Sequence, residues 1–325
     1  MLVLLIGFVV SLIIALLLTP LALPLLRKFK FGQSIRAEGP DSHRYKAGTP
    51  TMGGIVLLIG MSAGVLFLFK GDKDGLAVLL VTLGFGLIGF IDDYIKVVLK
   101  RSMGLRAREK LFGQGVVAAG LVCWVMFFSE RGTAWVLPFT NWISPGGFSI
   151  DLGWLPFLII TVLLAMGMAN AVNLTDGLDG LAAGVSCLTA LGMAIIAFWA
   201  GKDGVALAMA AMAGGCLGFL FFNRHPARLF MGDTGSLALG GGLAAAAVIS
   251  GSEFCLLLVG GIFIVEIMSV IIQVLSYQII GRRVFRMSPL HHHYELGGWP
   301  ESKVVRNFLA VSMVFMVLGL AGYLI

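Results

Sequence analysis

Long apolar runs, each followed by a short polar segment, make up most of the sequence. A helix needs about 20 apolar residues to cross a bilayer, whereas strands of a lipid-spanning barrel alternate apolar and polar residues over about ten positions. The runs here are continuous, so the pattern predicts an all-α polytopic membrane protein, a bundle of about ten transmembrane helices in a single domain over residues 1–325. The expected spans are 1–26, 50–69, 76–98, 111–129, 153–170, 181–200, 204–222, 235–250, 254–280 and 305–325.

Composition excludes a soluble protein. Hydrophobic residues make up 58% of the chain and charged residues 12%, against about 45–50% and about 25% in a typical soluble domain. Such a chain has too little polar surface to be wetted on all sides, which excludes soluble globular and disordered proteins. The four cysteines lie in or at the edges of apolar runs, without the spacing of a zinc site, so we expect buried hydrophobic residues.

The basic residues predict how the bundle is oriented. An even number of spans places both termini on the same side of the membrane. Most of the 23 Lys and Arg residues follow odd-numbered spans, and the opposite loops carry only Lys70, Lys73, Arg131 and Lys202. Because cytoplasmic loops are enriched in Lys and Arg, we expect both termini on the outer (periplasmic or extracellular) side. The outer loop 131–152 is expected to form a short interfacial hairpin.

Four polar segments rich in acids, amides and imidazoles all follow odd-numbered spans or precede even-numbered ones. By the expected topology they lie on the cytoplasmic side of the membrane. We therefore expect them to form one active site on the cytoplasmic face. The segments are IDDY (91–94), NAVNLTDGLDG (170–180), NRHPARLFMGDTGS (223–236) and SPLHHHYELGGWPE (288–301).

The paired carboxylates in two of these segments each allow two interpretations. Asp92 and Asp93 are about 100° apart on a helix, so one could contact a metal or substrate while the other orients it. They could equally be a helix-end pair with Lys96 as salt-bridge partner. Asp176 and Asp179 share a helix face and are followed by glycines that allow a ligand to approach closely, but a capped turn would use the same residues.

Asp233 and Glu266 stand in contrasting surroundings. Asp233 lies among small residues just before an apolar run, where there is room for hydrated Mg²⁺, although a helix N-cap would also explain it. Glu266 is the only acid in the middle of an expected span, because Asp92 and Asp93 lie near the end of theirs. Intramembrane charges are usually functional or paired, so the role of Glu266 stays open.

The run of three histidines favours anion recognition over a metal site. Three consecutive imidazoles cannot easily point at one zinc ion, and the sequence shows no cysteine or spaced fourth ligand. The same loop carries several arginines, so its donors suit an anionic ligand. The residues are His291, His292 and His293, with Arg282, Arg283 and Arg286 before them.

Acids that could hold Mg²⁺, beside basic residues that could hold phosphates, are typical of phosphoryl-transfer enzymes. The membrane setting adds that one substrate could be a lipid. The competing class is an ion-coupled transporter, which would place functional acids near the middle of the membrane and use paired broken helices. Here every acid except Glu266 falls in a loop or at a helix end.

Five longer motifs stand in order along the chain: GTPTMGGI (48–55), IDDYIKVV (91–98), NAVNLTDGLDGLAAG (170–184), FNRHPARLFMGDTGSLALGG (222–241) and FRMSPLHHHYELGGWPE (285–301). They resemble those of the phospho-N-acetylmuramoyl-pentapeptide transferases. This family is the peptidoglycan branch of the polyprenyl-phosphate N-acetylhexosamine-1-phosphate transferases, whose members share the Asp pair and the DGxDG and GDxGS segments. The GTPTMGG and HHHYELGGWPE segments indicate the branch.

The resemblance implies a reaction and its partners. Phospho-MurNAc-pentapeptide would pass from UDP-MurNAc-pentapeptide to undecaprenyl phosphate, giving lipid I and UMP, with Mg²⁺ as cofactor. This is the first membrane step of peptidoglycan synthesis and would place the chain in the bacterial cytoplasmic (inner) membrane. A transferase for another UDP-N-acetylhexosamine is the related alternative. A homodimer fits the family, and no nucleic-acid partner is expected.

The resemblance also implies a role for each motif residue. Asp233 would be the principal Mg²⁺ ligand, and Asp92, supported by Asp93, would deprotonate or orient the lipid phosphate. Direct attack on the β-phosphorus is expected, with a double displacement through an aspartyl intermediate as the alternative. The remaining residues would bind substrate: Lys46 and Lys110 the phosphates, Asn173, Asp176, Asp179 and Asn223 the nucleotide, Phe230 the uracil ring by stacking, and His291, His292 and His293 the closed site.

Overall fold

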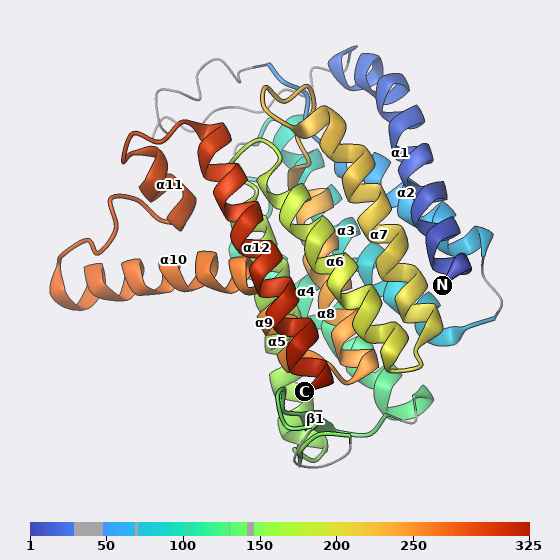
Figure 1. Ribbon diagram of the computed structural model, residues 1–325. Coiled ribbons are helices and arrows are strands. Elements are labelled where there is room, and N and C mark those ends of the chain that lie inside the picture. The colour runs from blue at the N-terminus through green and yellow to red at the C-terminus, as the bar shows by residue number, and fades with distance from the viewer. Residues whose placement is uncertain (29–47, 69–70, 102, 130, 142–145) are drawn as a thin grey trace.

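Helices account for most of the computed structural model, which describes residues 1–28, 48–68, 71–101, 103–129, 131–141 and 146–325. Figure 1 shows them side by side in a bundle, with a small sheet at one end. The elements are α1 (Leu2–Lys28), α2 (Gly54–Phe67), α3 (Lys73–Val97), α4 (Ala107–Phe128), β1 (Ala134–Val136), β2 (Ser149–Asp151), α5 (Trp154–Thr175), α6 (Leu181–Trp199), α7 (Asp203–Asn223), α8 (Gly232–Ser250), α9 (Glu253–Val259), α10 (Gly261–Ile280), α11 (Leu290–Glu295) and α12 (Glu301–Leu324).

Within the described residues, nine helices are long and apolar enough to cross a membrane. This confirms the polytopic helical fold, and the difference from the expected ten lies at α2. That helix has 14 residues, because the chain around Pro50 pairs with a distant loop instead of continuing the helix. The Phe230 amide donates to the Pro50 carbonyl at 2.8 Å, and the Gly53 amide donates to the Phe230 carbonyl at 2.9 Å.

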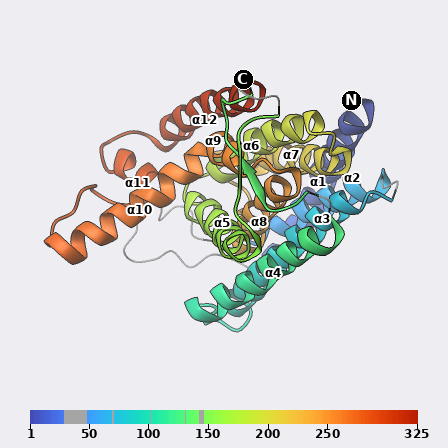
Figure 2. The same cartoon turned by 90° about the horizontal axis from the view of Figure 1, so that it is seen from below.

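The prediction of one continuous span over 254–280 is wrong. The helix breaks at Gly260, and α10 then leaves the bundle crosswise (Figures 1 and 2). Two consecutive glycines weaken the helix at this point. They also admit α12, since a side chain at Gly261 would place its Cβ 2.5 Å from the Phe315 ring. Only the first half of α10 is buried, ending at Ser269.

Helix α8 lies at the centre of the bundle, and Figure 2 shows it between α3 and α5. Every residue from Thr234 to Ile249 is buried. Small side chains allow this, because a Cβ at Gly240 would lie 2.5 Å from the Ala169 backbone and one at Gly241 would lie 2.4 Å from the Phe85 ring. In a bilayer, where burial from water does not drive helices together, close backbone approach of this kind stabilises the bundle through packing.

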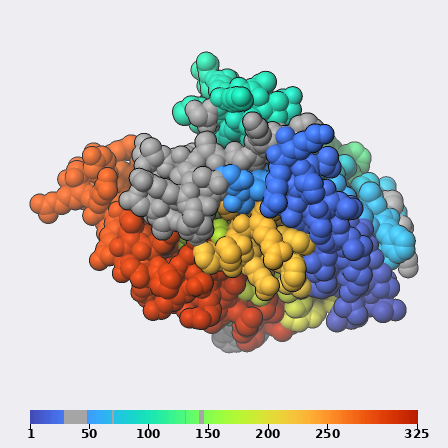
Figure 3. All heavy atoms as spheres, turned by 90° about the horizontal axis from the view of Figure 1, so that it is seen from above, coloured from blue at the N-terminus to red at the C-terminus, as the bar shows by residue number. Residues whose placement is uncertain are grey.

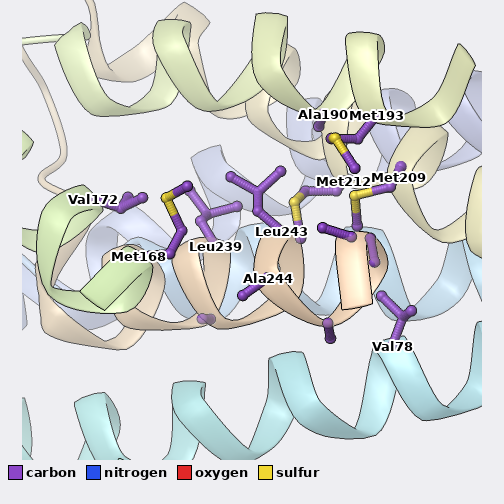
Figure 4. Packing of buried hydrophobic residues seen from close by; sticks show 14 of the residues in the cluster. Val78, Met168, Val172, Ala190, Met193, Met209, Met212, Leu239, Leu243 and Ala244 are labelled. Carbon is purple, nitrogen blue, oxygen red and sulfur yellow. The ribbon is translucent and has the colours of Figure 1, made fainter. Parts of the chain in front are cut away.

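Apolar side chains from five helices meet around α8. Methionines fill much of the space, as expected for a flexible side chain packed against irregular gaps. The residues in Figure 4 come from α3 (Val78), α5 (Met168, Val172), α6 (Ala190, Met193), α7 (Met209, Met212) and α8 (Leu239, Leu243, Ala244), and all of them are buried. This core holds the ends of α3, α5 and α8 in fixed relative positions.

The expected hairpin at loop 131–152 is confirmed by the antiparallel pairing of β1 with β2. It contacts the carboxyl end of α12, where the Phe139 amide donates to the Gly322 carbonyl at 2.7 Å. A buried ion pair between Arg131 and Glu253 ties it to α9. Figure 1 places both chain termini toward this end of the bundle, away from the loops that follow α3 and α7.

Candidate functional site

Three carboxylates meet where the end of α3 packs against the start of α8. Asp92 and Asp93 come from the last turns of α3, and Asp233 from the first turn of α8. One oxygen of each lies within 4.8 Å of the others. The helices approach backbone to backbone here, since a Cβ at Gly89 would lie 2.1 Å from the Asp233 carbonyl oxygen. Residues 140 positions apart in sequence therefore share one site.

Gly89→Ala is expected to destabilise the protein by about 1–3 kcal/mol, because the methyl group would force the α3 and α8 backbones apart. The separation would also move Asp233 away from Asp92 and reduce activity. Thermal unfolding in detergent and a transfer assay would measure both effects. Gly120→Ala is the matched control, because a Cβ at Gly120 of α4 meets nothing within 4 Å; equal behaviour of the two variants would contradict the close approach.

Asp93 organises the first turn of α8. Its carboxylate accepts hydrogen bonds from the Asp233 amide at 3.1 Å, the Thr234 amide at 2.9 Å and the Thr234 hydroxyl at 2.6 Å. Free amides at a helix start favour a carboxylate partner for electrostatic reasons. Asp93 is 4% exposed and both its oxygens are occupied. Its side chain therefore fixes the position of Asp233.

Asp92 and Asp233 share one lysine, Lys96, and Asp233 contacts a second one. The Lys96 ammonium lies 2.5 Å from Asp92 Oδ2 and 2.9 Å from Asp233 Oδ2. Lys110 of α4 also contacts Asp233 Oδ2, at 2.9 Å. The Leu105 amide donates to Asp92 Oδ1 at 2.7 Å, which orients that carboxylate. Opposite charges in contact stabilise the ionised carboxylates and hold them near one another.

Asn173 connects this cluster to the end of α5. Its amide nitrogen donates to Asp233 Oδ1 and to the Ser236 hydroxyl, both at 2.8 Å. The Ser236 hydroxyl in turn donates to the Gly232 carbonyl at 3.0 Å. Four helices, α3, α4, α5 and α8, thus contribute side chains to one polar network.

The donor set fits a hard divalent cation. Carboxylate oxygens are the ligands that Mg²⁺ prefers, and a small cluster of acids supplies them. Asp93 is held by two backbone amides and the Thr234 hydroxyl at the start of α8, whereas Asp233 and Asp92 face lysine side chains that can move aside. Asp233 and Asp92 are therefore the residues that would hold the ion. Lys96 and Lys110 would remain beside it as cations able to bind phosphate oxygens.

A second cluster fixes the loop between α5 and α6. The Asp179 carboxylate accepts from the Ala227 amide at 3.0 Å and lies 3.2 Å from His225 Nδ1. The Asp179 amide donates to Glu301 at 2.6 Å, and Glu301 also lies 3.4 Å from His225. Asn223 bridges the same loops by accepting from Gly180 and donating to Leu229. Asp179 and Asn223 therefore hold the loops around the site together.

The other expected binding residues lie on these loops. Asp176 is the C-cap of α5, rather than an N-cap, because Gly180 begins α6. Phe230 is half-buried in the loop before α8. Residues 224–226 of that loop are exposed, and the region around the loop forms part of the surface seen in Figure 3, between α1 and the carboxyl-terminal helices. Lys46 lies outside the described residues.

The three histidines occupy α11 and make different contacts. His291 is fully buried, with its Nδ1 3.2 Å from Glu266. His292 Nδ1 lies 3.0 Å from Glu295, and His293 Nδ1 accepts from the Arg286 amide at 3.1 Å. Their Nδ1 atoms therefore face three different partners.

Sequence reasoning gives only part of this network. The spacing of four residues predicts the contact of Lys96 with Asp92, but no local pattern predicts its contact with Asp233. His225 and Glu301 had no local signal, because they join the second cluster only through loops that are distant in sequence.

Comparisons with known proteins identify the family. The model of glycosyl transferase family 4 matches residues 75–251, and phospho-N-acetylmuramoyl-pentapeptide-transferase signature 1 matches residues 46–58. A phospho-N-acetylmuramoyl-pentapeptide-transferase of Pelotomaculum thermopropionicum is 63% identical over 98% of this chain and 97% of its own length. The enzyme of that name from Desulforamulus reducens is 56% identical over 96% and 93%, and that of Halalkalibacterium halodurans is 48% identical over 98% and 97%. The resemblance drawn from the motifs is confirmed, and the chain belongs to the phospho-N-acetylmuramoyl-pentapeptide-transferases, enzymes of glycosyl transferase family 4.

Proposed function

We propose that the protein transfers phospho-MurNAc-pentapeptide from UDP-MurNAc-pentapeptide to undecaprenyl phosphate, forming lipid I and UMP. The observation that carries this proposal is the convergence of Asp92, Asp93 and Asp233 with Lys110 and Asn173. Phosphoryl transfer needs groups that hold phosphates in line and offset their charge, and this network supplies both kinds. Family membership supports the choice of donor and acceptor.

The residues around the attacked phosphorus have separable tasks. Asp92, oriented by the Leu105 amide, would accept a proton from the lipid phosphate or orient it. Lys96 and Lys110 would hold phosphate oxygens of the donor, and their charge would reduce the repulsion between two anionic substrates. Mg²⁺ bound by Asp233 and Asp92 would withdraw charge from the diphosphate and make UMP a better leaving group.

The proposed step is a direct displacement. An oxygen of undecaprenyl phosphate forms a bond to the β-phosphorus of the donor, and the bond from that phosphorus to the UMP oxygen breaks. Asp233 and Asp92 are both bound to lysine ammonium groups, which lowers their nucleophilicity and disfavours an aspartyl-phosphate intermediate. A phosphorylated enzyme trapped with donor alone would show the double displacement instead.

Orientation in the membrane follows from the charge asymmetry. The loops around the site carry most of the basic residues, and the bundle end that holds both termini carries few. By the positive-inside rule the site would face the cytoplasm of a bacterial inner membrane, where a UDP-linked donor is soluble.

Nucleotide binding would use Asn173, Asp176 and Asp179, with Phe230 stacking on the uracil ring. A homodimer stays a prediction, which light scattering in detergent would test.

Radiolabelled UDP-MurNAc-pentapeptide, undecaprenyl phosphate and Mg²⁺ supplied to the purified protein test the proposal. Label is expected to pass into the lipid phase together with release of UMP, because the site is built to join these two phosphates. Chelation should lower the rate by at least about 10²-fold, and added Mg²⁺ should restore it.

Three controls separate the alternatives. Transfer from UDP-N-acetylglucosamine but not from the MurNAc donor would assign the protein to the related branch of transferases. Ion-driven solute uptake by vesicles containing the protein, without lipid labelling, would favour a transporter. A rate that survives exhaustive chelation would contradict the role of Mg²⁺.

A further inference from the structure

Glu266 is a buried acid that the proposed reaction does not use. It lies in the first half of α10 and is fully buried, as is His291 of α11. The His291 amide donates to Glu266 Oε1 at 3.2 Å, and His291 Nδ1 lies 3.2 Å from the same oxygen. The carboxylate therefore contacts both the backbone and the ring of one histidine.

The opposite edge of the His291 ring packs against the loop between α5 and α6. A Cβ at Gly177 would lie 2.3 Å from His291 Nε2 and 3.0 Å from Cε1. Gly177 stands between Asp176 and Asp179, the acids of the proposed nucleotide pocket. The ring thus fills the space between the Glu266 carboxylate and the backbone of that pocket.

The contact between Glu266 and His291 packs α10 against α11 at a cost in stability. Among the described residues, Glu266 Oε2 and His291 Nε2 have no hydrogen-bond partner, although both are buried. An unsatisfied buried polar atom destabilises a protein, and an apolar side chain would pack α10 without that penalty. Polar groups inside membrane proteins are retained mainly where they serve function. The presence of Glu266 is therefore explained better by its contact with His291 than by a contribution to stability.

We propose that Glu266 is a positioning residue, which holds His291 against Gly177 and so fixes α11 over the nucleotide pocket. The transverse helix α10 is thereby linked to the donor site through one histidine. The proposal rests on the proposed function for the identity of the nucleotide. It assigns Glu266 no contact with either substrate.

Glu266→Leu is expected to raise the KM for UDP-MurNAc-pentapeptide about tenfold, because it removes the acceptor of the His291 amide hydrogen bond, and to change kcat less than about twofold. The KM for undecaprenyl phosphate should not change. Glu266→Gln keeps an oxygen that can accept from the His291 amide, so its donor KM should stay within about threefold of wild type. A residue that only supports the fold would lower the active fraction and leave KM unchanged.

Gly177→Ala tests the other side of the ring. The added methyl group would displace His291 without altering Glu266, so it should raise the donor KM by a similar factor. Both changes release the same contact, so their effects should not multiply. The donor KM of the double variant should lie within about twofold of the KM of the more impaired single variant. Ser269→Ala is the matched control: it removes a buried hydroxyl one turn along α10 that bonds only to the Glu266 backbone carbonyl, and should leave the donor KM unchanged.

UMP binding, measured by calorimetry on the intact protein in detergent, separates this proposal from the proposed reaction. Weaker UMP binding by Glu266→Leu than by wild type and Glu266→Gln supports the positioning role, even if lipid I formation is not observed. An unchanged donor KM and UMP affinity in Glu266→Leu, with normal thermal unfolding, would overturn it. Multiplicative effects of Glu266→Leu and Gly177→Ala would overturn it as well, because the two sites would then act independently.

Discussion

Asp233→Asn is expected to slow transfer by about 10³-fold at saturating substrates and Mg²⁺. The substitution keeps the shape of the side chain but removes the charge that faces Lys96, Lys110 and Asn173. It also replaces one hard anionic ligand by an amide, so the affinity for Mg²⁺ should fall. The measurement is the initial rate of lipid labelling as a function of Mg²⁺ concentration, with rate and apparent metal affinity fitted separately.

Asp151→Asn provides the matched control, because it makes the same change in the exposed hairpin at the far end of the bundle. It should transfer at the wild-type rate. Turnover by Asp233→Asn at the wild-type rate would remove the metal assignment of Asp233 and leave Asp92 as the remaining candidate ligand in this cluster. A variant rescued fully by high Mg²⁺ would assign Asp233 to metal binding alone, without a further role at the diphosphate.

The fold was largely predictable, because the bilayer demands a continuous apolar helix wherever the chain crosses it. At two places, however, tertiary contacts and not hydropathy determine where a helix begins or ends. Gly260 and Gly261 continue an apolar run, yet the chain turns there because packing against Phe315 selects the turn. The run around Pro50 is shorter as helix because its backbone bonds to Phe230. Hydropathy registers neither contact.

The three clustered acids were predictable from the sequence, but their connections were not. Motif spacing indicated Asp92, Asp93 and Asp233, since small residues around an acid and an adjacent acid pair are unusual beside membrane spans. What joins them is the close approach of α3 to α8 at Gly89, a tertiary contact without a local pattern. Residue spacing alone did not separate the roles of Asp92 and Asp93, which the family resemblance implied, because those roles depend on which carboxylate meets the Thr234 amide.

Asp93→Asn is expected to lower both stability and activity, by about 2 kcal/mol and about 10²-fold. The asparagine has one oxygen for donors that occupy two, so its amide group would face an amide or hydroxyl of Asp233 or Thr234. The first turn of α8 would loosen and Asp233 would lose its fixed position. Thermal unfolding in detergent and the transfer rate measure the two effects on the same sample.

Two further variants show whether the losses share this cause. Thr234→Val removes only the hydroxyl donor to Asp93 and should cost about 1 kcal/mol, with a smaller loss of rate. Asp92→Asn keeps the oxygen that accepts from Leu105, so it should unfold like wild type yet transfer slowly. If Asp93→Asn unfolded like wild type while losing activity, its carboxylate would act on substrate or metal directly. Asp93 would then be a reacting acid and not a supporting one. The stability measurement decides this, because only a residue that holds α8 in place should lower the unfolding temperature when it is replaced.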